Sequence, residues 1–132
     1  MTARRLRVAV ATRAVDSVAV DVVRSTEVEP FTTKDGSTIR ELMRALNQSL
    51  AEATLASGQA TERHYHALSE ELYSFLEGGG RMEIDGEERD VGAGDTVLIP
   101  PGARHQITAG ADGARFLCCC APPYTHDDTY FD

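Results

Sequence analysis

The sequence predicts an all-β fold closed into a barrel or sandwich, and three observations lead to that prediction. Short segments rich in apolar, β-branched and aromatic residues follow one another at short intervals, with Gly, Pro and Asp between them. Asp85-Gly86 separates two of these segments and is typical of a two-residue hairpin turn, because both central residues adopt positive φ. The chain has 132 residues, 42% of them hydrophobic, which fits one compact domain with a buried core. Many short strands joined by regular turns indicate a barrel or a sandwich.

Alternating or continuous apolar patterns place the expected strands along most of the chain. In chain order they are residues 6–12, 17–23, 49–55, 62–68, 71–78, 81–85, 87–91, 95–100, 105–109 and 114–121. One further segment, residues 37–50, has apolar Ile39, Leu42, Met43 and Leu46 at helical spacing. It is either a helix of two to three turns or a strand beside a loop, and the pattern leaves both open. We therefore expect at most one or two short helices.

The net charge of the chain limits the classes of partner that it is expected to bind. A formal net charge of −8 argues against a nucleic-acid partner and against an anionic membrane surface. No apolar run reaches the roughly 20 residues of a membrane span. The first residues lack the apolar core and cleavage site of a secretory signal, so the expected location is cytoplasmic.

Three consecutive cysteines, Cys118 to Cys120, bear on both compartment and metal binding. Adjacent cysteines cannot build the disulfide framework of a secreted domain, and reduced thiols fit a cytosolic protein. Neighbouring residues of a strand face opposite sides, so three thiolates in a row cannot converge on one ion. We interpret the triplet as small apolar residues of a buried strand.

His64 and His66 are the first candidate metal ligands. Residues two apart in a strand lie on one face, about 7 Å apart, so both imidazoles project to one side and can share an ion. By itself, such a pair is as typical of surface or core histidines as it is of metal ligands. His105 adds a third imidazole, because Pro100-Pro101-Gly102 forces a turn and a new strand begins after it.

The spacing around these histidines forms two sequence signatures. The first runs without a gap through Gly58, five residues, His64-x-His66, four residues, Glu71, six residues and Gly78. The second runs through Gly94, five residues, Pro100-x-Gly102, two residues and His105, with Ala109 where it usually ends in Asn. A spacer of 15 residues separates Gly78 from Gly94.

With both signatures in order, the chain resembles the cupin superfamily, and small single-domain bacterial cupins in particular. The resemblance implies a double-stranded β-helix, or jelly-roll barrel, with one divalent metal ion inside its mouth. Carried over residue by residue, the implied ligands are His64, His66, Glu71 and His105. Ala109 replaces no ligand, so the implied metal site is unaffected.

Glu70 and Glu71 both lie within reach of an ion on spacing alone. The six-residue interval to Gly78 selects Glu71, and strand parity agrees, because Glu71 shares a face with Tyr73 and Phe75. We interpret that face as the barrel interior and Glu70 as a solvated turn residue.

Three neutral imidazoles and one carboxylate suit Fe, Mn, Ni, Cu or Zn as the divalent ion, one per chain. A six-coordinate ion would keep about two positions for water, substrate or dioxygen, which is a catalytic arrangement. The leading hypothesis is a metal-dependent, dioxygenase-like oxidoreductase that acts on a small molecule. The alternatives are a non-redox isomerase or polyketide-type cyclase, and a small-molecule binding or sensing module. Tyr73, on the inward face, is a candidate catalytic residue, although a plain core role fits equally well.

The remaining predictions concern domain organisation and the ends of the chain. We expect one domain over residues 1–132, in which residues 58–109 hold the metal-binding motifs. Residues 1–25 are rich in valine and alanine, and their strands are expected to pair in a homodimer, with or without exchange between subunits. Residues 121–132 form a tail, exposed or packed over a barrel end, in which His126 looks like a further ligand only superficially.

Overall fold

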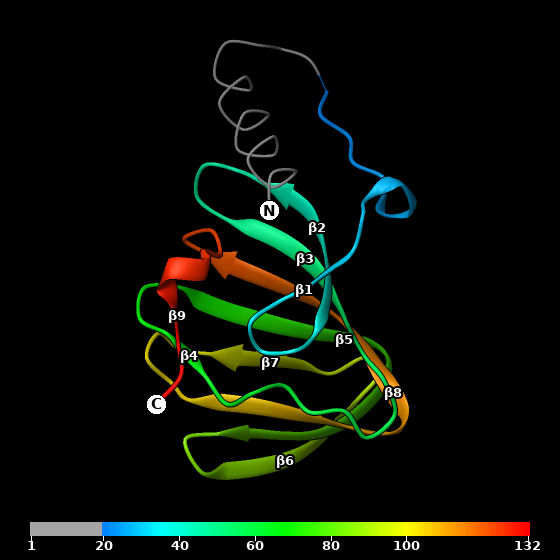
Figure 1. Cartoon of the computed structure of the whole chain (residues 1–132), viewed down its shortest axis with the longest axis vertical. Coiled ribbons are helices and arrows are strands. Elements are labelled where there is room, and N and C mark those ends of the chain that lie inside the picture. The colour runs from blue at the N-terminus through cyan, green and yellow to red at the C-terminus, as the bar shows by residue number, and fades with distance from the viewer. Residues whose placement is uncertain (1–19) are drawn as a thin grey trace.

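Strands dominate residues 20–132, the part of the chain that the computed structural model describes (Figure 1). They are β1 (Phe31–Thr32), β2 (Thr38–Arg44), β3 (Ser49–Leu55), β4 (Tyr65–His66), β5 (Glu70–Ile84), β6 (Glu87–Gly92), β7 (Thr96–Ile99), β8 (His105–Ala121) and β9 (Thr129–Tyr130). Two 3-10 helices, η1 (Ser25–Glu27) and η2 (His126–Asp128), complete the secondary structure of these residues. The predicted all-β fold with at most two short helices is confirmed.

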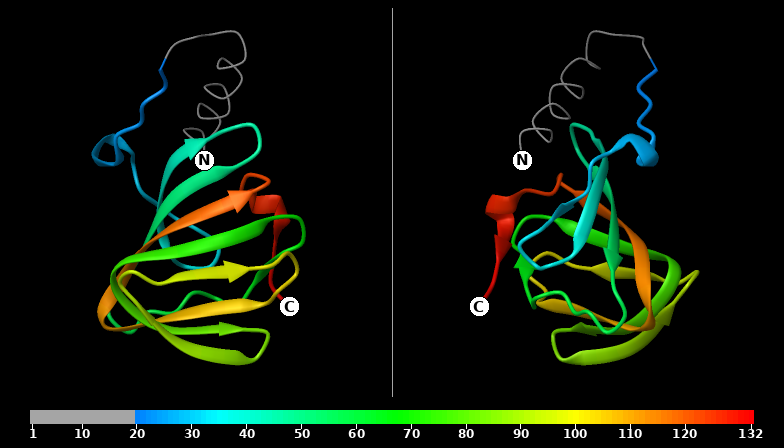
Figure 2. Two further views of the ribbon diagram at one scale, coloured as in Figure 1. Left: turned by 180° about the vertical axis from the view of Figure 1, so that it is seen from behind. Right: turned by 45° about the vertical axis from the view of Figure 1, so that its right-hand side comes forward.

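Seven strands form one antiparallel sheet in the order β1-β2-β3-β8-β5-β6, and β7 pairs with β5 outside this path. β4 and β9 form a separate two-stranded ladder. Figure 2 shows the large sheet curving round so that its strands enclose an interior, the form of a jelly-roll barrel. Alternate side chains of each strand therefore point into that interior.

The two long strands β5 and β8 pair along most of their length and bend together. β7 pairs with the first half of β5, and β6 pairs with the second half, so β5 belongs to two parts of the barrel wall. A Cβ at Gly78 would collide with the carbonyl oxygen of Gly113, and one at Gly80 would collide with that of Thr108. Only glycine allows the backbones to approach this closely at the bend.

Alternation along β5 separates an inward face from an outward face. Glu71, Tyr73 and Phe75 are each at most 4% exposed, whereas Leu72 between them is 41% exposed. The inward face joins a core to which neighbouring segments contribute Leu55, Ile99, Ile107 and Phe116. The prediction that the face of Glu71 lines the barrel interior is confirmed.

Residues 37–50 form two strands with a turn between them and no helix. β2 ends at Arg44 and β3 begins at Ser49, so the strand alternative is the correct one. Sheet pairing buries Ile39 and leaves Leu46 78% exposed in the turn, which breaks up the apolar face that a helix would have presented. The pairing of β2 with β3, and of β3 with β8, has outweighed the local periodicity.

The Asp85-Gly86 hairpin turn is confirmed, with φ of 48° at Asp85 and 92° at Gly86. Residues 1–19 lie outside the described residues, and most of the expected N-terminal strands lie there. Residues 20–23, the described end of the expected strand 17–23, are not in a strand. In the described part of the chain no neighbouring strand pairs with them, so that end of the prediction is wrong.

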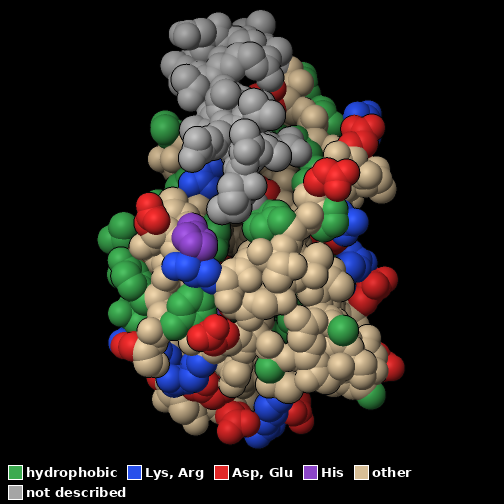
Figure 3. Space-filling model, in the orientation of Figure 1, with side chains coloured by type: hydrophobic (Ala, Val, Ile, Leu, Met, Phe, Trp, Pro, Cys, Tyr) green, Lys and Arg blue, Asp and Glu red, His purple; other side chains and the backbone are tan. Residues whose placement is uncertain are grey.

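The surface carries mixed charge. On the face seen in Figure 3, acidic and basic side chains are interspersed, most densely around the end of the molecule that β6 forms. Glu87, Glu88, Arg89 and Asp90 of that strand are all exposed. Within residues 20–132, no helix has the length and apolar character needed to cross a membrane.

Candidate metal centre

Three histidines from two separate segments meet inside the barrel. His64 lies directly before β4, His66 ends β4, and His105 begins β8. Reciprocal backbone hydrogen bonds of 3.1 and 2.8 Å between His64 and His105 hold two of these segments together. One ring nitrogen from each histidine lies within 4.8 Å of those of the other two. The side chains are at most 4% exposed, and together they form a buried group that could bind a metal ion.

The Nδ1 atom of each ring faces a main-chain carbonyl. The carbonyl oxygens are those of Glu62 for His64 (2.7 Å), Asp128 for His66 (3.1 Å) and Ala103 for His105 (2.9 Å). Because a carbonyl only accepts, Nδ1 carries a proton in each ring, and Nε2 is the atom left to present a lone pair. Bonds of this kind fix the tautomer and the ring orientation of metal-binding histidines.

Glu71 of β5 borders the histidine group. Its Oε1 lies 3.3 Å from Nε2 of His66 and 3.6 Å from Nε2 of His105. Among the described residues, neither Glu71 Oε1 nor His105 Nε2 has a hydrogen-bond partner, and both atoms are buried. Burying such atoms unpaired is costly, and a divalent ion between them would satisfy both. The donor set of three imidazoles and one carboxylate therefore fits a transition metal.

The structure thus brings the four predicted ligands together and separates the two neighbouring glutamates. Glu70, the first residue of β5, is exposed, while Glu71 is 4% exposed and faces the histidines. His126 is exposed on η2 and lies outside the group. Metal binding by the four residues stays a prediction.

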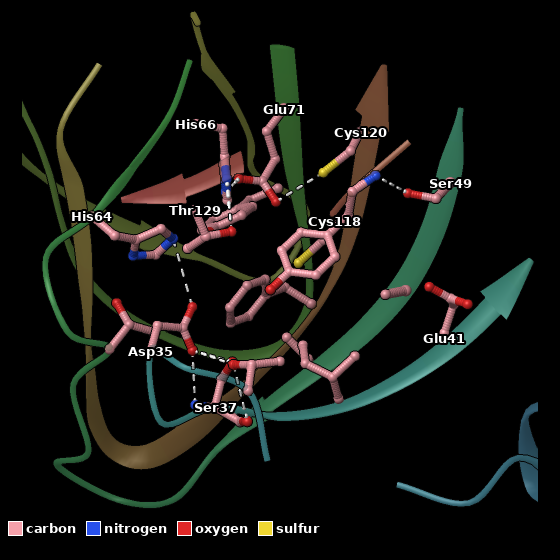
Figure 4. Close-up of a pocket in the computed structure, with 18 residues that line it drawn as sticks. Asp35, Ser37, Glu41, Ser49, His64, His66, Glu71, Cys118, Cys120 and Thr129 are labelled. Atoms are coloured by element: carbon pink, nitrogen blue, oxygen red, sulfur yellow. Dashed lines mark hydrogen bonds and ion pairs between the residues drawn. The ribbon is translucent and has the colours of Figure 1, made fainter. Parts of the chain in front are cut away.

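Asp35 also faces this group, although no sequence pattern identified it as a site residue. It lies in the loop between β1 and β2, where its Oδ1 accepts hydrogen bonds from Thr33 Oγ1 (2.6 Å), Ser37 N (2.9 Å) and Ser37 Oγ (2.6 Å). Its other oxygen, Oδ2, lies 3.6 Å from Nε2 of His64. Figure 4 shows this carboxylate directed at the His64 ring across the cavity floor. The local sequence Thr33-Lys34-Asp35-Gly36-Ser37 indicates only a turn.

A cavity adjoins the histidines and extends between β2, β3, β5 and β8 (Figure 4). Its walls combine carboxylates, hydroxyls, thiols and apolar groups, among them Asp35, Ser37, Ile39, Glu41, Ser49, Ala53, Tyr73, Phe116, Cys118, Cys120, Tyr124 and Thr129. None of the described residues that line it is Lys or Arg. Tyr73 therefore lines the cavity, as predicted, and also packs against Phe75 and Phe116 in the core.

Mutual contacts shift the pKa values of the site. Burial would raise the pKa of Glu71, but the nearby imidazoles of His105 and His66 lower it below its usual value, so the carboxylate is ionised. Burial would lower the pKa of His66, but the close contact with the charged Glu71 carboxylate raises it. Burial and the neighbouring His105 lower the pKa of His64. In the metal-free site His66 therefore binds a second proton at Nε2 more readily than a free imidazole does, and an ion would displace that proton.

Burial raises the pKa of the Tyr73 phenol well above its usual value, and the charge of Glu71 adds to the shift. The phenol is therefore protonated at neutral pH and can donate a hydrogen bond. Tyr73 is suited to act as a donor to a substrate oxygen, and it is not suited to act as a base.

The cysteine triplet alternates across the barrel wall. Cys118 and Cys120 line the cavity, while Cys119 faces outward near Gln48. Because Cys119 points away from Cys118 and Cys120, the three thiols do not face one ion, in agreement with the prediction. Burial raises the pKa of Cys118 and of Cys120, so both thiols are protonated. Cys120 Sγ donates to Glu71 Oε2 at 3.3 Å.

Residues 125–132, which we call the C-terminal strap, lie against β4, the strand that ends at His66. β9 pairs with β4, and Figure 1 shows the two side by side at one edge of the barrel. The Asp128 carboxylate accepts hydrogen bonds from the backbone N–H groups of Ala67, Leu68 and Ser69 at 3.0 to 3.2 Å. Its main-chain carbonyl accepts from His66 Nδ1. The tail is thus a packed segment, one of the two predicted alternatives.

Comparison with known proteins places the chain among cupins. Residues 51–120 match the family described as the cupin domain. An uncharacterized protein of Methanocaldococcus jannaschii is 46% identical over 109 residues, which span 78% of this chain and 87% of that protein. The polyketide synthase CurC of Streptomyces cyaneus is 29% identical over 113 residues, or 81% of this chain and 73% of CurC.

Solved structures show the same fold. The nucleoside dehydratase Pac13 of Streptomyces superposes with a TM-score of 0.74, covering 85% of this chain and 90% of Pac13. The two sequences are 17% identical, so this likeness bears on the fold alone.

Proposed function

Because this chain belongs to the cupin family, and because its buried histidine group adjoins a cavity, we propose that it is a metal-dependent enzyme acting on a small molecule. The observation that carries the proposal is that two buried atoms of the histidine group and its neighbour, Glu71 Oε1 and His105 Nε2, have no hydrogen-bond partner among the described residues. They face the Nε2 side of the histidine group, where an ion would sit. The proposed ligands are His64, His66, Glu71 and His105.

The ion, when bound, would act as a Lewis acid that polarises a substrate oxygen and acidifies a neighbouring proton. The surrounding residues have complementary roles. Main-chain carbonyls keep the three imidazoles aligned, and the apolar walls around Ile39, Ala53 and Phe116 exclude water from part of the cavity. The protonated Tyr73 can donate to a substrate oxygen.

We propose that the reaction is a proton transfer without net oxidation, as in a lyase, an isomerase or a cyclase. Asp35 supports this choice, because its carboxylate is held by three hydrogen bonds on Oδ1 and keeps Oδ2 at the edge of the histidine group. A fixed carboxylate there is placed to accept a proton from a substrate carbon or hydroxyl. The similarity to the polyketide synthase CurC is compatible with such chemistry.

A dioxygenase-like oxidoreductase is the second candidate. Three histidines and one carboxylate would leave about two positions of a six-coordinate ion for substrate and dioxygen. A binding or sensing module without catalysis is the third.

The test begins with the metal. Protein from unsupplemented cells should carry about one divalent ion per chain, and His105→Ala should lose most of it, because a ligand bond is removed. His126→Ala is the matched control, since His126 is exposed and outside the group. Full occupancy in His105→Ala would refute the proposed site.

The second step separates the reactions. The protein is loaded with Zn(II) or Fe(II) and screened against enols, catechols, polyketide-like phenols and nucleosides, with and without oxygen. Turnover by the zinc form under strict anaerobiosis is expected, because zinc has no accessible redox change. Turnover that requires both Fe(II) and oxygen would favour the dioxygenase instead, and metal-dependent binding without turnover would favour the sensing module.

A further inference from the structure

Glu71 and Cys120 are direct register partners on the paired strands β5 and β8. The side chains of both point into the barrel, where Glu71 is 4% and Cys120 is 2% exposed. Figure 4 shows the Cys120 sulfur directed at the Glu71 carboxylate. The thiol donates to Glu71 Oε2 at 3.3 Å, a buried contact that no solvent molecule would easily replace.

The two oxygens of Glu71 have different partners. Oε2 accepts from the Cys120 thiol, while Oε1 faces Nε2 of His66 at 3.3 Å and Nε2 of His105 at 3.6 Å. A carboxylate that binds a metal through one oxygen is usually oriented by a donor at the other. Among the described residues, the Cys120 thiol is the donor recorded at Oε2.

We propose that Cys120 is a positioning residue for the metal centre. Its S–H group holds Glu71 Oε2 toward β8, which turns Oε1 toward His66 and His105 and sets the carboxylate for binding through a single oxygen. A thiol is a weak donor, so it orients the carboxylate without drawing much charge from the oxygen that faces the ion. The inference deepens the proposed function, because it rests on the proposed metal centre.

The chain offers a closely matched test at this position. Thr and Val have nearly the same shape, but only Thr can donate a hydrogen bond. Cys120→Thr should bind Co(II) nearly as tightly as the native protein and keep the visible absorption bands of the bound Co(II). Cys120→Val should bind Co(II) about 10-fold more weakly and shift those bands, because Glu71 is no longer oriented. Affinity is measured by competition with a chromophoric chelator, with no substrate present.

A smaller pair, Cys120→Ser and Cys120→Ala, keeps the test informative if a β-branched residue disturbs the strand. Ser should again match the native affinity and spectrum, and Ala should match Val. Cys119→Val is the positional control, because Cys119 faces outward on the same strand, and it should leave both readouts unchanged. Thermal unfolding of each variant verifies that the barrel is intact.

Equal Co(II) affinities and equal spectra for Thr and Val, with Ser and Ala also alike, would overturn the inference and leave Cys120 with a packing role. That result would leave the proposed metal centre standing, since the native protein would still bind the ion. A native protein that binds no Co(II) would overturn both the centre and the inference. The proposed reaction is not involved in any of these readouts, so its failure would be seen separately.

Discussion

Oδ2 of Asp35 lies 3.6 Å from Nε2 of His64, although the two residues belong to different loops. Three hydrogen bonds from Thr33 and Ser37 fix the other oxygen of this carboxylate. The proposed proton acceptor is therefore held in place by the protein before any substrate binds, so it should need little reorganisation to receive a proton.

Asp35→Asn should preserve the shape of the loop and remove the proton acceptor. We expect kcat to fall by about 100-fold or more, the range for loss of a general base, while metal content stays at the native level. Steady-state kinetics on the substrate identified by screening, together with elemental analysis, provide the measurement.

Asp112→Asn, at an exposed position of β8, is the control and should behave like the native protein. An Asp35→Asn variant with native kcat would remove Asp35 from the mechanism. One that had lost its metal would reassign Asp35 to the metal site.

Glu71→Gln should bind the metal ion much more weakly than Glu70→Gln does. Loss of an outer hydrogen-bond partner weakens metal binding by about 10–100-fold, and loss of the carboxylate ligand Glu71 should cost at least that much. Glu70 is exposed, so its replacement should leave affinity unchanged. Competition titrations with a chelator measure both, and the reverse order would contradict the assignment of Glu71.

The sequence allowed much of this arrangement to be predicted because strand parity is a local rule. The shared face of His64 and His66, the choice of Glu71 over Glu70, and the Asp85-Gly86 turn each follow from spacing over a few residues. The cupin signatures added His105, which no local rule connects to His64.

Other features depend on long-range contacts that local spacing does not encode. Residues 37–50 have a helical apolar pattern and became parts of two strands, because β2 pairs with β1 and β3, and β3 pairs in turn with β8. Asp35 and Asp128 looked like ordinary turn and tail residues, and only the folded chain brings them against His64 and His66. The Cys120 thiol could be assigned to a buried strand, but not to Glu71.

Asp128→Ala should destabilise the strap and the turn that it holds. The backbone N–H groups of Ala67, Leu68 and Ser69 would lose their acceptor, at a cost of about 1–3 kcal/mol in the free energy of unfolding. Denaturant unfolding of the metal-free protein measures this loss. Asp127→Ala, at the exposed neighbouring position, is the control and should leave stability within about 0.5 kcal/mol of native. Equal stability of the two variants would show that the hydrogen bonds of the Asp128 carboxylate contribute nothing to the free energy of unfolding.

The metal-free protein should show a defined order of histidine titration. The usual pKa of histidine is about 6.5. His64 should titrate below that value because burial and His105 lower its pKa, and His66 should titrate above it because Glu71 raises its pKa. NMR of the imidazole C–H groups during a pH titration measures the order, with single His→Gln variants for assignment.

The two shifts act oppositely on stability. The contribution of His64 to folding stability is complete above pH about 6.5 and is lost as pH falls through its lowered pKa. The contribution of His66 to folding stability is complete below pH about 6.5 and is lost as pH rises through its raised pKa. Glu71 adds stability that is lost at acid pH, as pH falls through its lowered pKa. A titration in which His64 protonates before His66 on acidification would contradict the site geometry.

We propose that the chain forms a homodimer in solution. Residues 1–19, on which the prediction of paired N-terminal strands mainly rested, lie outside the described residues. The described part of the sheet adds an outward row of register neighbours, Leu50, Cys119, Leu72 and Leu98, in which Leu72 is 41% and Leu98 is 53% exposed. An exposed apolar row of this kind is often covered by a partner.

Light scattering at micromolar concentration should give the mass of two chains, and Leu98→Asp should shift the population toward one chain. Thr96→Asp, two residues away on β7 and also exposed, serves as the control for added charge on the same face. A native protein of single-chain mass, with its first 25 residues intact, would refute the dimer.

The position of the C-terminal strap in the chain also affects when, during translation, the proposed metal site can be completed. All four proposed ligands leave the ribosome before Asp128, whose carbonyl orients the His66 ring and whose carboxylate holds the turn after β4. A nascent chain that has reached His105 has every ligand but still lacks the segment that aligns one of them. We therefore expect stable binding of the proposed ion only after residue 128 has been translated, and a chain truncated before Asp128 should form a barrel that retains metal poorly.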